Sequence, residues 1–184
     1  MSRKPVHGAW RARAKAVEDA RRAVHETFAQ MERRSDRDDP ATIAWSAACS
    51  RFHRLLADAY PPQFQAAAQR LRDGDPSGLE EIIDFLEADP RFHSSGYAKE
   101  DLLRLLGRVE LDEQQAERLR GVVLAKVDSG AGREFRRYCR LARRLDTPGL
   151  RAELERRLDD LDEGVRDRAG WVLAGLPDWK PPTA

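Results

Sequence analysis

Apolar residues recur at spacings of three and four along most of this chain, which is the pattern of amphipathic helices. The clearest case lies between residues 146 and 176, where a polar corner at residues 160–164 separates two apolar stripes. Thr147-Pro148 is typical of a helix start, Asp162 is the expected cap of the next helix, and Pro177 ends it. The first stripe is Leu150, Leu154, Leu158 and Leu161, and the second is Val165, Ala169, Val172, Leu173 and Leu176. Neither helix can bury its stripe alone, so the pair needs a neighbour on each side.

The same paired organisation extends back to Asp75. A helix begins there, and its partner, rich in leucine between residues 102 and 106, follows a long link at residues 89–97. The next pair begins at Asp112 and turns at residues 128–132. First helices therefore start near Asp75, Asp112 and Thr147, at steps of 37 and 35 residues, which is the range of two-helix solenoid units.

Residues 146–176 resemble a HEAT repeat, the helix-turn-helix unit of α-solenoids. The family pattern is a proline-led first helix, an Asp-rich corner, a Val-Arg pair and a small residue. It is matched by Thr147-Pro148, Asp160-Leu161-Asp162, Val165-Arg166 and Ala169. The resemblance implies an all-α stack of helix hairpins, a HEAT-like α-solenoid, over residues 75–176, with the second helices along its concave side. It implies no reaction.

Residues 1–74 lack the repeat pattern and are expected to form an N-terminal helical cap on the apolar end of the stack. One long helix is predicted at about residues 8–34, a second at about 40–59 and a short third after Pro62. Ile43 and Ala47 are expected on the inner side of the second helix. Residues 177–184 form a proline-rich tail.

Composition agrees with a single helical domain, since 35% of the 184 residues are charged and 41% are hydrophobic. No run approaches the length of a membrane span and the start lacks a signal peptide's apolar core, so we expect a cytoplasmic protein without membrane contact. A net charge of +1 gives no overall attraction to nucleic acid, so any electrostatic function must be local. Cys49 and Cys139 fall on apolar helix faces, which favours buried free thiols over a disulfide or a nucleophile.

The sharpest candidate for function is the predicted helix at residues 133–145, which carries six arginines and one acid, Glu134. Five of the arginines follow helical spacing and form one stripe: Arg133, Arg136, Arg137, Arg140 and Arg144. Like charges one turn apart repel by a few tenths of a kcal/mol per pair, so something outside this helix is expected to offset them. The resemblance to a HEAT stack implies that the stripe lies in the groove, where Arg104 and Arg108 of the preceding second helix extend it.

Planar guanidinium groups suit carboxylates and phosphates, because either anion accepts a bidentate pair. Two partner classes therefore fit: an acidic protein segment or a nucleic-acid backbone. The competing interpretation is a solvated face neutralised by acids of neighbouring helices, such as Glu117, Glu153 or Asp167. Arginine outnumbers lysine 28 to 5, a bias that a GC-rich genome also produces.

The link at residues 89–97 is the second candidate, because it is long for a helical repeat. His93 with Ser94 or Ser95 is open to interpretation as a base and nucleophile, but no orienting acid follows from the spacing. A structural interpretation explains the same residues: Ser94 or Ser95 caps the next helix while Phe92 and Tyr97 anchor the loop. His93 and Tyr97 also stand at one rim of the predicted arginine groove.

Other residues give weaker signals. The four histidines are dispersed and there is no phosphate loop or Cys-x-x-Cys pair, so we expect no metal and no cofactor. Trp10, Trp45 and Trp171 recur with apolar residues and are expected in the core, whereas Trp179 of the tail either docks on the last helix or anchors a partner.

The sequence therefore predicts a non-enzymatic protein-binding adaptor or scaffold that uses its arginine surface on an acidic partner. The alternative is nucleic-acid binding with DNA-repair chemistry, because some HEAT-like proteins are DNA glycosylases; their catalytic residues have no match here. A hydrolase using His93 is a third hypothesis. The oligomeric state stays open, since the alanine-rich first helix suits packing on its own stack or on a second copy.

Overall fold

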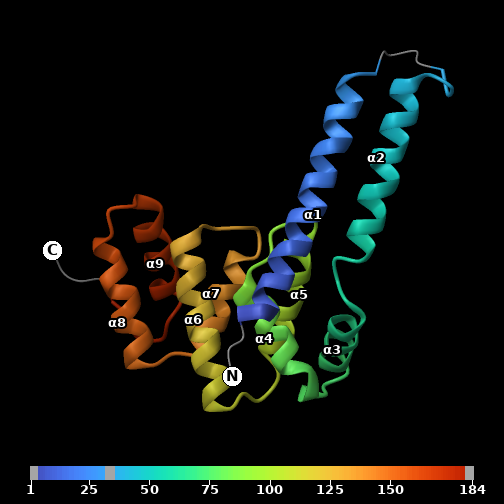
Figure 1. Cartoon of the computed structure of the whole chain (residues 1–184). Helices are drawn as coiled ribbons and strands as arrows, with labels where there is room; N and C mark the ends of the chain where they lie inside the picture. The colour runs from blue at the N-terminus through green and yellow to red at the C-terminus, as the bar shows by residue number, and fades with distance from the viewer. Residues whose placement is uncertain (1–3, 32–35, 181–184) are drawn as a thin grey trace.

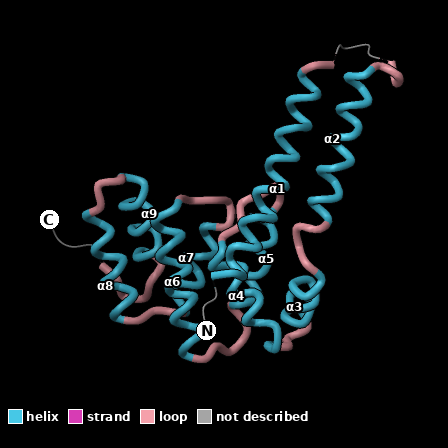
Figure 2. Tube along the Cα trace, viewed as in Figure 1, coloured by secondary structure: helices cyan, strands magenta, loops and turns pink. Residues whose placement is uncertain are grey.

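The structure is a computed structural model that describes residues 4–31 and 36–180, and every regular element in these ranges is helical (Figures 1 and 2). The α-helices are α1 (Lys4–Ala29), α2 (Pro40–Ala57), α3 (Pro62–Arg72), α4 (Leu79–Ala88), α5 (Ser95–Leu106), α6 (Glu113–Ser129), α7 (Phe135–Arg144), α8 (Pro148–Arg156) and α9 (Glu163–Ala174). Short 3-10 turns precede α4 at Pro76–Gly78 and follow α8 at Arg157–Asp159. The predicted all-α class is confirmed.

The helix starts lie where the capping residues predict them. Asp112 accepts a hydrogen bond from the Gln115 backbone N–H and forms a complete capping box, and Thr147 accepts one from the Leu150 N–H. Asp162 accepts from the Gly164 N–H at 2.7 Å. Each cap satisfies an N–H group that the helix itself leaves free, which explains why short-range sequence determines these boundaries.

The hairpins of the second half lie side by side in the body of the molecule (Figure 1). Among the helices that begin each hairpin, α4 packs against α6 and α6 against α8. Among those that end each hairpin, α5 packs against α7 and α7 against α9. The predicted neighbours of the arginine helix, α5 and α9, are therefore its actual neighbours.

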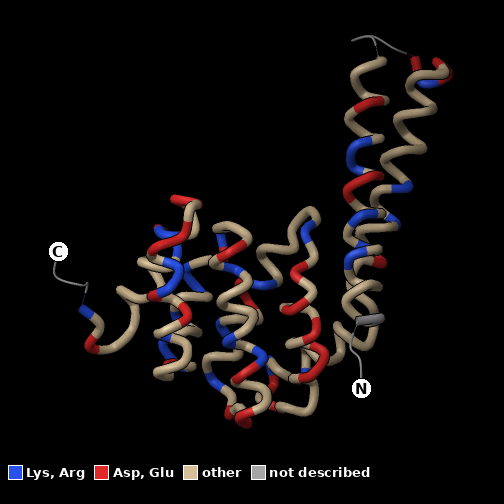
Figure 3. The backbone as a smooth tube through the Cα atoms, turned by 60° about the vertical axis from the view of Figure 1, so that its left-hand side comes forward, with Lys and Arg blue, Asp and Glu red and all other residues tan. Residues whose placement is uncertain are grey.

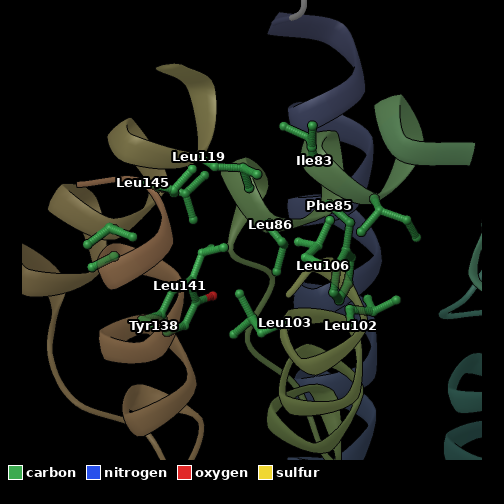
Figure 4. Packing of buried hydrophobic residues seen from close by; sticks show 14 of the residues in the cluster. Ile83, Phe85, Leu86, Leu102, Leu103, Leu106, Leu119, Tyr138, Leu141 and Leu145 are labelled. Carbon is green, nitrogen blue, oxygen red and sulfur yellow. The ribbon is translucent and has the colours of Figure 1, made fainter. Parts of the chain in front are cut away.

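One hydrophobic core runs from Trp10 of α1 to Leu176 after α9. Figure 4 shows its centre, where Leu86 of α4, Leu103 of α5 and Tyr138 of α7 approach one another. All three side chains are buried. Burying a large apolar side chain stabilises the fold by roughly 1.5–3 kcal/mol, so this centre fixes α5 and α7 against α4.

The N-terminal helices pack differently. The short α3 contacts α4 and α5, while α1 pairs with α2 in a long hairpin that also contacts α4. In Figure 1 this hairpin extends well beyond the body. A small second cluster of Ala14, Val17, Ala59 and Phe92 packs its base. The first helix starts and ends earlier than the predicted residues 8–34, and residues 32–34 of that prediction lie outside the described ranges.

Several apolar residues that the pattern places inside are exposed. Leu161 is 100% exposed, because α8 ends at Arg156 and the stripe does not continue into the corner. Trp171 is 57% exposed, and its ring lies 6.0 Å from the Phe135 ring in a T-shaped arrangement. Ile43 is 56% exposed on the outer side of α2. Trp10, by contrast, is in the core as predicted.

We expect Gly78→Ala to destabilise the fold, because a methyl group there would lie 2.7 Å from the Ala67 Cα of α3. Relief requires α3 to move, and overpacking of this kind costs about 1–3 kcal/mol. Gly121→Ala in α6 is the matched control, since a methyl group there meets nothing within 4 Å. Urea unfolding should show a loss for Gly78→Ala and a gain of up to about 1 kcal/mol for Gly121→Ala. Equal midpoints would contradict the close contact between α3 and the 3-10 turn.

Candidate anion-binding surface on α5 and α7

A hollow of about 330 Å³ lies between α5 and α7 and is lined mainly by arginine. Its lining residues are Leu103, Arg104, Gly107, Arg108, Arg137, Arg140, Leu141 and Arg144. Five guanidinium groups therefore surround one small space with no carboxylate among the lining residues. We call this feature the arginine hollow. It joins Arg104 and Arg108 to the predicted stripe.

Three of these guanidinium groups have no acidic partner within the described residues. Arg108 and Arg140 make no hydrogen bond or ion pair through their side chains in that part of the chain. Arg144 donates to the Leu106 carbonyl at 2.7 Å and to the Val109 carbonyl. These carbonyls belong to the C-terminal end of α5, where backbone acceptors lack helical partners. Arg144 is thus held in place while its charge stays uncompensated by a carboxylate.

The other two arginines of the hollow, Arg104 and Arg137, are paired, and so is Arg133 of the stripe. Glu100 of α5 accepts from Arg137 at 3.4 Å and from Arg133 at 3.3 Å. Arg104 donates to Asp101 at 2.7 Å, and this bond, together with Arg72, holds the pKa of Asp101 below its ordinary value. Neutralisation by a neighbouring helix is therefore correct for part of the stripe. The acid that neutralises it is Glu100, whereas Asp101 pairs with Arg104 of its own helix and with Arg72 of α3.

The acids named in the sequence analysis have other roles. Glu117 pairs with Arg120 of its own helix, and Glu153 pairs with Arg156 and Arg157. Asp167 forms no ion pair with the arginine stripe in the described ranges. Periodicity identified which helices meet, but not which turns of those helices face each other.

The other residues predicted to contact a partner lie at different places relative to the hollow. Tyr97 is 62% exposed and does not anchor the loop; instead its ring lies 3.5 Å from the Arg133 guanidinium, a cation–π contact at one end of the surface. Arg136 is exposed and lies outside the hollow. Trp179 is half-buried against the core, so it docks on the body.

His93 belongs to the junction with the N-terminal hairpin. Its backbone N–H donates to Glu18 of α1, and its ring lies 6.2 Å from the Phe52 ring of α2. Ser95 Oγ accepts from the Phe92 N–H, and the ring nitrogens of His93 make no hydrogen bond with any described residue. Ser94 occupies the cap position of α5 but its side chain makes no capping hydrogen bond, while Phe92 is buried as expected. The contacts that a serine nucleophile needs are not formed.

A buried network of charges joins the two corners that precede α5 and α7. Lys99, 1% exposed, donates to Asp89 at 2.5 Å and to the Pro90 carbonyl at 2.8 Å. Lys126 pairs with Glu134 at 2.9 Å and lies 3.7 Å from Asp89. Since Lys99 lies near the start of α5 and Glu134 directly precedes α7, this network fixes the two helices that form the arginine hollow.

Burial disfavours the charged forms of Asp89 and Lys99 in the network, and neighbouring charges oppose it to different degrees. Burial alone would raise the pKa of Asp89, but Lys99, Lys126 and Arg91 outweigh it and the pKa lies below its ordinary value. Burial lowers the pKa of Lys99, and Asp89 only partly opposes this. Burial also raises the pKa of Tyr138, whose hydroxyl finds no hydrogen-bond partner in the described structure. The phenol therefore stays protonated.

The sequence analysis missed this network, although a signal exists. Lys126 falls on the stripe made by Leu119, Val122 and Val123, and Lys99 lies three residues before Leu102. A lysine within an apolar stripe at helical spacing points inward, and there it requires a buried acid. Asp89 follows α4 with a positive φ of 41°, so its position depends on the fold and not on a periodic pattern.

Another cluster of acids surrounds Arg118 of α6. This guanidinium donates to Asp84 at 2.5 Å and to Glu87 at 2.7 Å, and His7 Nε2 lies 3.1 Å from Glu87. The geometry of His7, Asp84 and Glu87 is close enough for metal ligands. Because Arg118 already supplies a positive charge to both carboxylates, the cluster is explained as an ion-pair network.

Comparison with protein-family models, with curated proteins and with solved structures finds no match to this chain. Among the described helices, none has both the length and the apolar composition to cross a bilayer.

Proposed function

We propose that this protein is a non-enzymatic adaptor whose arginine hollow binds an acidic segment of a partner protein. In this proposal the helices form a HEAT-like stack with an N-terminal helical cap, and α5 and α7 present the binding surface. The observation that carries it is the group of three guanidiniums, from Arg108, Arg140 and Arg144, without a carboxylate partner in the described chain. A carboxylate placed among them would form charge-assisted hydrogen bonds, which are about twice as strong as neutral ones.

The surroundings of the hollow favour a short acidic peptide over a nucleic-acid backbone. Glu100 and Asp101 stand beside it on α5 and neutralise the arginines there, so the uncompensated positive charge is confined to the hollow and does not continue along the surface. Figure 3 shows Lys, Arg, Asp and Glu interspersed over the body, in agreement with the net charge of +1. A duplex gains its affinity from many phosphates spread over a basic face. One compact cationic hollow instead fits two or three carboxylates.

Fluorescence anisotropy with two labelled probes tests this proposal. The first probe is a short peptide of alternating glutamate and aspartate residues, and the second is a DNA duplex of mixed sequence. We expect the peptide to bind with modest salt dependence and the duplex to bind weakly at low salt. Duplex binding that is tighter than peptide binding, with a log-log salt slope of about −0.9 for each phosphate contacted, would replace the adaptor proposal by nucleic-acid binding.

A further inference from the structure

Helix α2 is anomalous because it buries none of its side chains, although it is long and largely uncharged. Residues 40–50 contain no charged side chain, in a chain where 35% of residues are charged. Figure 3 shows this segment as an uninterrupted tan stretch between a charged start and a basic residue near its end. A helix that faces water on one side normally carries charged residues there.

The side of α2 that faces α1 is accounted for by the hairpin. Trp45 lies on that side, with its ring 6.1 Å from the Phe28 ring of α1. The opposite side, which we call the outer face of α2, is exposed and has no cover in the described structure. Its residues are Ile43, Ala44, Ser46, Ala47 and Ser50. Two paired helices can bury only the stripes between them, so any cover for this face must come from helices outside the hairpin, as in a four-helix bundle.

The charges at the two ends of α2 indicate what covers it. Three acids, Asp36, Asp38 and Asp39, and one base, Arg37, lie at the start of the helix and give it a net charge of −2, whereas Arg51 and Arg54 lie in its last turns. Two such helices packed antiparallel, with Ala47 near the middle, bring the acidic start of each beside the basic end of the other. Parallel packing would place like charges together. The surface is thus complementary to itself, which is what a twofold-symmetric interface requires.

We propose that the outer face of α2 binds the same face of a second copy of this chain, so that the two α1–α2 hairpins form an antiparallel four-helix bundle. The projection of the hairpin beyond the body leaves room for this approach (Figure 1). Small side chains at its centre, Ser46, Ala47 and Ser50, allow the helix axes to come close. This surface is separate from the arginine hollow, so the two proposals stand or fall independently.

Sedimentation equilibrium of the full chain tests the self-association. We expect the wild type to reach twice the chain mass of 20.9 kDa as protein concentration rises. Ala47→Glu places two glutamates, one from each copy, near each other at the middle of the interface. This variant should be a monomer at the concentrations where the wild type is dimeric. Ala12→Glu is the matched control, because Ala12 is an exposed alanine on α1 outside the outer face of α2. It should dimerise as the wild type does.

A charge-swap pair tests the antiparallel arrangement even if Ala47→Glu folds poorly. Arg54→Glu should weaken the dimer, and adding Asp38→Arg in the same chain should restore it, because each Arg54 site faces the acidic end of its copy. A wild type that stays monomeric at every concentration overturns the proposal, and monomeric protein that binds a membrane vesicle or another protein through this face does so too. A dimer that persists in folded Ala47→Glu also overturns it. Circular dichroism of each variant establishes that the helices are retained.

Discussion

The Arg108→Glu/Arg140→Glu variant is expected to lose binding of the acidic peptide by roughly a hundredfold or more. Both side chains line the arginine hollow and neither has a partner in the described chain, so their replacement breaks no internal bond. Each charge-assisted hydrogen bond contributes about 1.5–3 kcal/mol, and every 1.4 kcal/mol is tenfold in affinity. Helix content and melting temperature should stay near those of the wild type.

The matched control is Arg11→Glu/Arg22→Glu, which makes the same change in net charge on α1, away from the hollow. If attraction is only a matter of total charge, both variants will lose affinity equally. If the hollow is the site, the control keeps most of its affinity. A folded Arg108→Glu/Arg140→Glu protein that still binds the peptide as the wild type does would remove the hollow from the account.

Asp89→Asn should be the most damaging conservative change in the body, with a loss of about 3–5 kcal/mol in the free energy of unfolding. Asparagine tolerates the left-handed backbone of this position, so the change removes the charge and keeps the turn. Lys99, 1% exposed, then keeps a positive charge without its counter-ion. Removing one member of a buried pair costs about this much because the other is left uncompensated.

Asp101→Asn is the control for this prediction, since its pairs with Arg72 and Arg104 lie at the surface. Exposed pairs contribute about 0–1 kcal/mol, so urea unfolding at neutral pH should separate the two variants clearly. Equal losses would mean that the network of Asp89, Lys99, Lys126 and Glu134 does not hold the corners together.

The pH dependence of stability follows from the signs of the shifts. The pKa of Asp89 is lowered in the folded state, so its contribution is full above its unfolded pKa of about 3.9 and is lost as pH falls through the folded pKa. The pKa of Lys99 is also lowered, so the unfolded chain binds more protons at alkaline pH and stability rises with pH there. In Asp89→Asn this rise should be larger, because Lys99 loses its anion and sheds its proton more readily. Urea midpoints at acidic, neutral and alkaline pH measure it.

The sequence predicts the helices and their starts because both depend on nearby residues. Thr147, Asp112 and Asp162 cap within three residues of themselves, and the leucine stripes need only a period. Burial is harder, because it depends on what packs against a helix. Ile43 and Trp171 both lie on an apolar pattern, yet the described residues leave more than half of each side chain exposed.

For the candidate site, the sequence indicated which arginines lie together but not which of them are neutralised. The arginine periodicity, with the alignment of successive second helices, correctly joined Arg140 and Arg144 to Arg108 across α5 and α7. Which arginines keep an uncompensated charge could not be predicted, because Glu100 neutralises two of them from one turn of α5. The buried lysines were not predicted, because their acidic partners lie outside any periodic pattern. Asp89 directly follows α4, and Glu134 directly precedes α7.

The most direct test of the central claim is an NMR titration of the arginine side-chain N–H signals with the acidic peptide. Arg108→Lys, Arg140→Lys and Arg144→Lys assign the three signals of interest by their disappearance. We expect these three Nε–Hε signals to shift together and to saturate at the same peptide concentration, while those of Arg120 and Arg157, bound to internal acids, do not shift. Saturable binding that shifts other arginines and leaves these three unchanged would contradict it.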